Sequence, residues 1–278
     1  MVSSDDHQAE DASSPDESAV APDVPEAGQS LTREQEDALD DEVLGELDGV
    51  EQDESRGGQR QISVIFASIH GFDTESDMHH DEIEEIAMKK AGFDSELTTA
   101  IEECGGQIDK IIRGFFMATF GTTTATKEDP VMAVLGGMRM CEIADQFDAE
   151  VHVGVNTGLA WVGQIKTERT IDTTVIGDAV NLSARLKTQA AKNQVVCSPD
   201  AYEQTKDYFE YEVLRELPPG TLKGIERSMT VYEPLTATDK ATAVANLRGG
   251  DDDRLAELEE HIPEYLKAMI AEGASRLQ

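Results

Sequence analysis

Basic residues are scarce in this chain. Among its 278 residues, 23 lysines and arginines stand against 57 aspartates and glutamates, giving a formal net charge of -34. A surface so dominated by carboxylates repels the phosphates of nucleic acids and of anionic membranes. We therefore expect neither a nucleic-acid partner nor membrane insertion. The excess acid also suits a high-salt habitat, where ions screen the self-repulsion; a chain that stays stable without added salt would argue against that origin.

Long apolar runs and paired cysteines are also lacking. No stretch of eighteen apolar residues occurs, so no transmembrane helix is expected. The first residues, MVSSDDHQAE, have neither the basic nor the apolar region of a signal peptide. Cys104, Cys141 and Cys197 show no CxxC or metal-ligand spacing, which favours buried thiols in a reducing compartment. These absences together predict a cytoplasmic protein.

Aromatic residues are absent from the N-terminal part of the chain. Residues 1–58 contain none, and they combine many acids and serines with Pro15, Pro22 and Pro25. Such a segment cannot bury enough apolar surface to offset its ordering entropy. The sequence therefore predicts a disordered acidic tail over 1–58, with one helix at 31–47. The alternative is a docking segment for a basic partner.

The C-terminal part, residues 238–278, is predicted to be a linker followed by an amphipathic helix. Pro263 would kink that helix. Its apolar stripe recurs every three or four residues and comprises Leu255, Leu258, Ile262, Tyr265, Leu266, Met269 and Ile270. Two interpretations stay open: the helix packs on its own domain, or it faces a partner or a second copy.

The middle part, residues 59–237, alternates between strand-like and helix-like patterns and is predicted to be one domain. The expected strands are 61–69, 105–112, 115–121, 151–165, 173–177, 194–199 and 228–235. The expected helices are 81–104, with a break at Gly92, 130–147, 178–192 and 200–208. The order strand-helix-strand-strand-helix-strand, with additions, is typical of a ferredoxin-like core. The predicted fold class is therefore α+β.

Five segments carry a family resemblance. They are ISVIFASIHGF, GGQIDKIIRGFFMATFG, VHVGVNTGLAWVG with its N-T-G turn, TTVIGDAVNLSARL and LKGIERSMTVYEP. In order and spacing, across about residues 60–235, they resemble the catalytic domain of class III nucleotide cyclases. The resemblance implies a phosphorus-oxygen lyase that converts a nucleoside triphosphate to a cyclic nucleotide and pyrophosphate. It also implies two protomers paired head to tail, as a homodimer or heterodimer, with each site at their interface.

The metal-binding half of that family site is substituted in this chain. The resemblance places its two metal-binding aspartates at Ser68 and Gly114. A lone hydroxyl is a poor ligand for Mg²⁺, and glycine offers no side chain. Asp73 lies beyond the loop, and Asp109 adjoins Lys110 on a strand, where neighbouring side chains point to opposite faces. We expect neither aspartate to substitute, so Mg²⁺ or Mn²⁺ would bind only if a partner chain supplies the carboxylates.

The half of the site that recognises the base and stabilises the transition state is kept. The resemblance assigns the base-reading positions to Lys110 and Thr174, and a lysine there suits adenine and hence ATP. Asn181 would orient the ribose, and Arg185, one helical turn later, would hold the transferring phosphate. Lys223 matches the position that reaches the triphosphate. The alternative for each is an ordinary polar residue of a strand, helix or loop.

A short loop could also hold phosphates. Its residues Ile69, His70, Gly71 and Phe72 follow an apolar strand, and backbone N–H groups can bind anions whatever the side chains are.

The asymmetry between the two halves resembles the second cytosolic domain of mammalian transmembrane adenylyl cyclases, which commonly reads FASI in the first segment. Three functions stay open. The chain is a regulatory or nucleotide-binding module that is inactive or very weak as a homodimer. Alternatively, it is the complementary half of a heterodimeric adenylyl cyclase, or a weakly active cyclase with unusual metal ligands.

Overall fold

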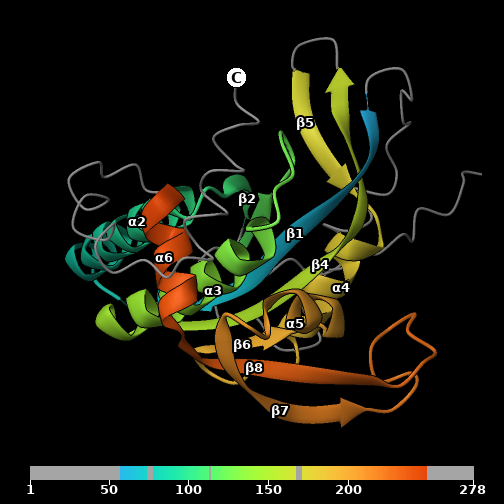
Figure 1. Ribbon diagram of the computed structural model, residues 1–278. Coiled ribbons are helices and arrows are strands. Elements are labelled where there is room, and N and C mark those ends of the chain that lie inside the picture. Colours follow the sequence, from blue (N-terminus) through green and yellow to red (C-terminus); the bar gives the residue numbers. More distant parts are fainter. Residues whose placement is uncertain (1–56, 74–77, 113, 167–170, 249–278) are drawn as a thin grey trace, which may run out of the picture.

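The computed structural model describes residues 57–73, 78–112, 114–166 and 171–248 (Figure 1). The acidic tail and the amphipathic C-terminal helix lie outside these residues, so both stay predictions. Across the described part of the chain, no helix is long and apolar enough to cross a membrane.

Within these described ranges, eight strands form a single sheet. In chain order they are β1 (Gly57–His70), β2 (Gln107–Ile112), β3 (Phe115–Phe120), β4 (Glu150–Lys166), β5 (Ile171–Ile176), β6 (Gln194–Cys197), β7 (Phe209–Leu217) and β8 (Met229–Ala237). Their order in the sheet is β2-β3-β1-β4-β6-β8-β7, and β5 pairs with the far end of β4. The first four strands have the β2-β3-β1-β4 order of a ferredoxin-like core, which confirms the predicted fold class.

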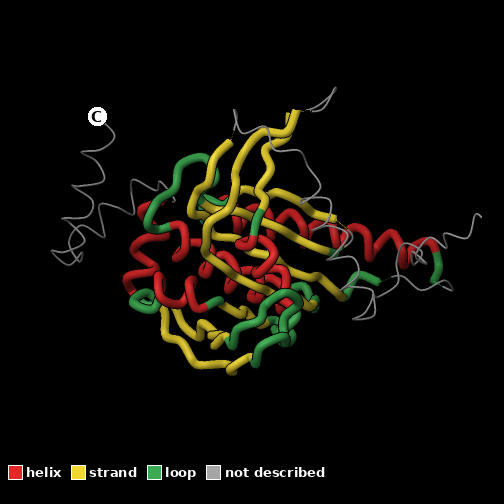
Figure 2. The backbone as a smooth tube through the Cα atoms, turned by 90° about the vertical axis from the view of Figure 1, so that its right-hand side faces the viewer, coloured by secondary structure: helices red, strands yellow, loops and turns green. Residues whose placement is uncertain are grey.

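The part of the chain that the structure describes also contains five helices: α2 (His80–Glu103), α3 (Asp129–Gln146), α4 (Asp178–Lys187), α5 (Pro199–Thr205) and α6 (Asp239–Arg248). In Figure 1, α2, α3 and α6 gather on one side of the central strands, and α4 lies apart from them. Figure 2 gives the perpendicular view, in which α2 extends outward from the body of the domain. The helix α6 occupies the segment that the sequence analysis treated as a linker.

The central strand β1 contributes to two hydrophobic cores because its side chains alternate between faces. All eight residues from Ile62 to Ile69 are buried. Ile65 and Ala67 pack with residues of α2 and α3, whereas Val64 and Phe66 pack with Val180 and Ala184 of α4. A strand covered on both faces reads as a continuous apolar run, which is why QISVIFASI predicted a buried strand.

The helix α4 approaches the sheet very closely at Gly154 of β4. A β-carbon placed on this glycine would lie 2.1 Å from the carbonyl oxygen of Ser183 and 2.6 Å from the backbone nitrogen of Lys187. Only a residue without a side chain therefore lets α4 pack directly on the strand. This contact fixes the position of the helix that carries Asn181 and Arg185.

Local sequence signals were wrong in several places. The expected break at Gly92 is absent, because α2 runs through that residue, where Phe147 packs beside the glycine. The N-T-G stretch at Asn156 is continuous strand within β4, and α4 ends at Lys187, before residue 192. The strand β7 was not predicted, although its first five residues, FEYEV, alternate between apolar and charged side chains as a strand does.

Candidate functional site

The expected first metal position, Ser68, lies on the face of the sheet that α4 covers. It shares that face with Phe66, two residues earlier on β1. Its direct neighbours are Phe115 on β3 and His152 on β4. Ser68 is only 4% exposed. The position therefore holds a buried hydroxyl, with an aromatic ring on one side and an imidazole on the other.

The expected second metal position, Gly114, lies in the turn between β2 and β3. Its φ of +85° is in the left-handed region that favours glycine. Its carbonyl oxygen accepts a hydrogen bond of 2.7 Å from the Ile69 N–H, and a β-carbon added at Gly114 would lie 3.1 Å from the Ile69 carbonyl oxygen. The turn is thus held against β1 by backbone contacts, and an aspartate there would be strained.

The residues at these two positions do not fit a metal site. Hard divalent cations need carboxylate or phosphate oxygens, and neither position supplies one. Within the described ranges, no cluster of three or more aspartate, glutamate, histidine or cysteine side chains could hold a metal ion.

The base-reading candidate Lys110 faces the same side of the sheet as α4. It pairs with Met117 of β3, which in turn pairs with Phe66 of β1, and directly opposed residues share a face. The register between β2 and β3 shifts between Ile108 and Lys110, so Asp109 is the extra residue of a β-bulge. The expectation that Asp109 and Lys110 point to opposite faces assumed an unbroken strand, and the bulge breaks that alternation.

The carboxylate of Asp109 is a largely buried charged group next to Lys110. Among the described side chains, its Oδ2 atom is buried and has no hydrogen-bond partner. Burial raises the pKa of Asp109, and the positive charge of Lys110 opposes that rise. The folded state therefore binds this proton more tightly than the unfolded chain, and stability falls as pH rises above about 4.

We expect Asp109→Asn to raise the melting temperature at pH 7, because it removes a buried charge. The gain should shrink towards pH 4, where the wild-type carboxyl becomes protonated in both states. Thermal unfolding across that pH range tests this, with the exposed Asp207→Asn as the control of equal charge change. A lower melting temperature for Asp109→Asn at pH 7 would show that the carboxylate is stabilising.

The helix α4 presents Asn181 and Arg185 one turn apart, and both are half-buried. The Arg185 guanidinium lies against Gly224, where an added β-carbon would be 3.4 Å from one of its nitrogens. Gly224 has a φ of +73° and directly follows the exposed Lys223. The structure therefore brings Arg185 and the Lys223 loop together, whereas Lys110 stands on the edge strand β2.

The remaining predicted positions are placed by their backbones. Thr174 lies on β5 and pairs with Gly163 of β4. β1 extends to His70, so the predicted phosphate loop begins only at Gly71, which is exposed and has a φ of +98°. The Ile69 N–H already donates to Gly114, so it is not available to a phosphate in this conformation.

Sequence reasoning missed Lys187, a fully buried residue at the end of α4. The signal was present, because Val180, Ala184 and Lys187 follow the i, i+4, i+7 spacing of one helix face. It also missed His152, which becomes a neighbour of Ser68 only through the pairing of β1 with β4.

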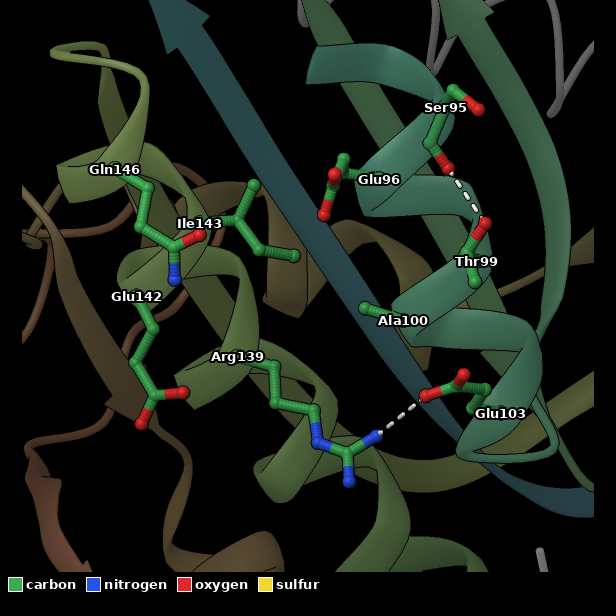
Figure 3. A pocket seen from close by; sticks show the side chains of 9 residues that line it. All are labelled: Ser95, Glu96, Thr99, Ala100, Glu103, Arg139, Glu142, Ile143 and Gln146. Atoms are coloured by element: carbon green, nitrogen blue, oxygen red, sulfur yellow. Dashed lines mark hydrogen bonds and ion pairs between the residues drawn. The ribbon is translucent and has the colours of Figure 1, made fainter. Parts of the chain in front are cut away.

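A separate hollow of about 410 Å³ lies between α2 and α3 (Figure 3). Arg139 reaches across it to Glu103, at 3.4 Å between nitrogen and oxygen. Glu96 and Glu142 also line it, so carboxylates outnumber the one guanidinium. An acidic hollow repels a triphosphate. Its helices cover the sheet face opposite α4, so it is distinct from the predicted site.

Comparison with known proteins decides the family. The family model of the adenylate and guanylate cyclase catalytic domain matches residues 55–233. The chain belongs to this family. The match spans the segments on which the resemblance to class III nucleotide cyclases was based, except the final residue, Pro234, of the last one, and it confirms that resemblance.

Individual relatives agree with this assignment. The terminal-differentiation-specific adenylate cyclase of Dictyostelium discoideum is 28% identical over 185 residues, covering 63% of this chain and 8% of that protein. The adenylyl cyclase CyaB from P. aeruginosa is 25% identical, with a TM-score of 0.57 covering 66% of this chain and 97% of that structure. The guanylyl cyclase Cya2 shares the fold at 24% identity, with a TM-score of 0.59 and coverage of 66% and 96%. The chain thus spans only a small part of the Dictyostelium cyclase.

Proposed function

We propose that this cyclase domain binds a nucleoside triphosphate, preferentially ATP, and does not cyclise it as a homodimer. The observation that supports the proposal is that neither of the two expected metal positions carries a carboxylate. Ser68 is a buried hydroxyl, and Gly114 is a left-handed turn residue whose backbone is bonded to β1. In a head-to-tail homodimer each of the two sites would lack both carboxylates.

The absence of these carboxylates matters because of the chemistry they support. In the family reaction, bound divalent cations would lower the barrier by activating the 3′-hydroxyl and neutralising the phosphates. A site without ligands for them keeps only what its own residues supply, which is binding and orientation. We therefore propose a regulatory or nucleotide-binding role in cyclic-nucleotide signalling, carried by a domain over residues 59–237.

The residues that would bind the nucleotide have specific tasks. Lys110, on the α4 face of β2, would donate a hydrogen bond to adenine N1, and Thr174 on β5 would contact the same base. Asn181 would orient the ribose. Arg185, which lies against Gly224, and Lys223, the residue before that glycine, would place two positive charges at the phosphates. Binding by these groups needs no metal, whereas cyclisation does.

A second function is favoured by the arrangement of two side chains on α4. Asn181 and Arg185 share one helix face, and Gly224 leaves room for the Arg185 guanidinium. This is the half of the site that acts on the transition state. Paired with a chain that carries both carboxylates, the domain would complete one competent adenylyl cyclase site. The partner would then supply the metal ligands, and this chain would supply Lys110, Thr174, Asn181, Arg185 and Lys223.

The first test measures binding and turnover separately. The purified chain with ATP and Mn²⁺ should form no cyclic AMP above background. The same chain should bind ATP in EDTA by calorimetry, and Lys110→Ala should weaken that binding roughly 10- to 150-fold, since a hydrogen bond from a charged group contributes roughly 1.5–3 kcal/mol. Lys127→Ala, which removes an exposed lysine outside the site, is the matched control.

The outcomes separate the functions. Cyclic AMP formation by the wild type would overturn the claim of an inactive homodimer and favour the weakly active cyclase. A complete lack of ATP binding, with or without Mn²⁺, would leave a domain that signals only through its protein partners.

A further inference from the structure

The side chain of Lys187 lies on the face of the sheet that carries Ser68. Its backbone nitrogen lies above Gly154 of β4, as the 2.6 Å approach at that glycine shows. Its ammonium lies over the ring of Phe115 of β3, 4.5 Å from the ring centroid. Gly154 pairs with Phe66, and Phe115 pairs with Ser68, from opposite sides of β1. The lysine side chain therefore runs from above β4 towards β3, on the face of β1 that carries Phe66 and Ser68.

This ammonium is enclosed and stabilised by aromatic rings. Lys187 is 1% exposed, and its Nζ is also 6.0 Å from the centroid of the Phe66 ring. The faces of aromatic rings attract a cation, and the attraction is stronger where water is excluded. Lys187 thus places a buried positive charge on the face where Ser68 stands.

The other polar neighbour of Ser68 offers no metal ligand. His152 has both ring nitrogens engaged, with Nδ1 2.9 Å from the Ala190 carbonyl oxygen and Nε2 2.8 Å from Oε1 of Glu150. An imidazole nitrogen must give up such a contact before it can coordinate a metal. Mg²⁺ keeps several waters or oxygen donors, and among the described residues no cluster of three or more His, Cys, Asp or Glu side chains could hold a metal ion.

We propose that the ammonium of Lys187 stands in for a divalent cation beside Ser68 and keeps this position free of metal. A carboxylate restored at residue 68 would pair with Lys187 instead of binding Mg²⁺ or Mn²⁺. The proposal deepens the proposed function, and rests on it, by naming the residue that makes the site metal-independent. Lys187 touches the rings beneath it and acts on Ser68 by charge, so it is a positioning residue and not a catalytic one.

The test measures Mn²⁺ binding alone, without nucleotide or turnover, by loss of the free-ion signal in electron paramagnetic resonance. Ser68→Asp should bind Mn²⁺ no better than the wild type. Ser68→Asp combined with Lys187→Met should bind at least tenfold more tightly than Ser68→Asp. The matched control is Ser68→Asp with Lys127→Met, which removes the same charge at an exposed position and should leave the Ser68→Asp affinity unchanged.

Thermal unfolding provides a second, independent reading of the same contact. Ser68→Asp should lower the melting temperature less in the wild-type background than in the Lys187→Met background, because only the former offers the buried acid a partner. The proposal would be overturned if Ser68→Asp lowered the melting temperature equally in both backgrounds. It would also be overturned if Ser68→Asp alone bound Mn²⁺ as tightly as the variant that also carries Lys187→Met. Neither result depends on whether the domain binds ATP, so a failure here is distinct from failure of the proposed function.

Discussion

Two forms of this chain that are each inactive alone should make cyclic AMP from ATP when they are mixed. The first copy is the natural sequence, which keeps Arg185 but lacks metal carboxylates. The second carries Ser68→Asp, Gly114→Asp and Lys187→Met to create the metal half, together with Arg185→Ala to disable its own transition-state half. Only a mixed dimer can then contain one complete site.

Replacing Arg185 with alanine in the first copy as well should lower the rate of the mixture about 10²–10³-fold. Loss of one group that stabilises developing negative charge has an effect of this size, because a guanidinium acts only where charge builds up. The measurement is cyclic AMP formation from ATP and Mn²⁺ at a fixed ratio of the two copies. Arg215→Ala is the control, since Arg215 is exposed on β7 and contacts the Gln189 carbonyl instead.

Folding of the second copy must be checked, because Gly114 has a positive φ and an added β-carbon there meets the Ile69 carbonyl oxygen. Circular dichroism and the melting temperature of that copy decide whether it is folded. If both copies are folded and the mixture is silent, the complementary-half function is wrong and the binding module remains. If Arg185→Ala leaves the rate of an active mixture unchanged, the role assigned to Arg185 is wrong.

Among glycine-to-alanine substitutions in this domain, Gly154→Ala should lower the free energy of unfolding the most. Its β-carbon would lie 2.1 Å from the Ser183 carbonyl oxygen and 2.6 Å from the Lys187 nitrogen, both of which are backbone atoms of α4. No side-chain rotation relieves such a clash, so α4 must move off the sheet. We expect a loss of about 3 kcal/mol or more in the free energy of unfolding, the upper end for overpacking.

In a domain of this size that loss corresponds to a fall of more than about 6 °C in melting temperature. Differential scanning calorimetry measures it. Gly58→Ala, on the same sheet but with no atom within 4 Å of its added β-carbon, should change the melting temperature little. An equal effect of the two substitutions would mean that close packing of α4 on Gly154 does not limit stability. ATP binding should weaken in Gly154→Ala as well, since α4 carries Asn181 and Arg185.

Periodicity was enough to predict most of the fold. The apolar run from Ile62 to Ile69, the hairpin through Arg113 and Gly114, and the helix that begins near Pro130 are all local patterns, and the structure contains each of the expected elements. Failures occurred where tertiary packing overrides local propensity. Gly92 disfavours a helix by about 1 kcal/mol relative to alanine, yet the packed α2 tolerates it. The edge strand β7 was also missed, although FEYEV alternates; the alternation breaks at Leu214 and Arg215, where the register against β8 shifts.

The bulge at Asp109 shows the same limit within the site. Strict alternation predicts which face a strand residue occupies, but one extra residue shifts every later side chain to the other face. Nothing in the letters QIDKII marks that insertion. The register against β3 decides it, and this register places Lys110 on the face of α4.

By itself, the sequence determined the family and the α+β core, and it placed Ser68 and Gly114 at the expected metal positions, because these follow from residue identity and order. Only the tertiary structure decided which side chain lies near the expected metal position at Ser68. Gly154, Phe115, Ser68 and Lys187 come from four separate elements, and they meet because β1 pairs with β3 and β4 while α4 packs on Gly154. Contacts between distant segments depend on strand register and helix docking, which no local pattern encodes, so the buried lysine beside Ser68 could be found only in the folded chain.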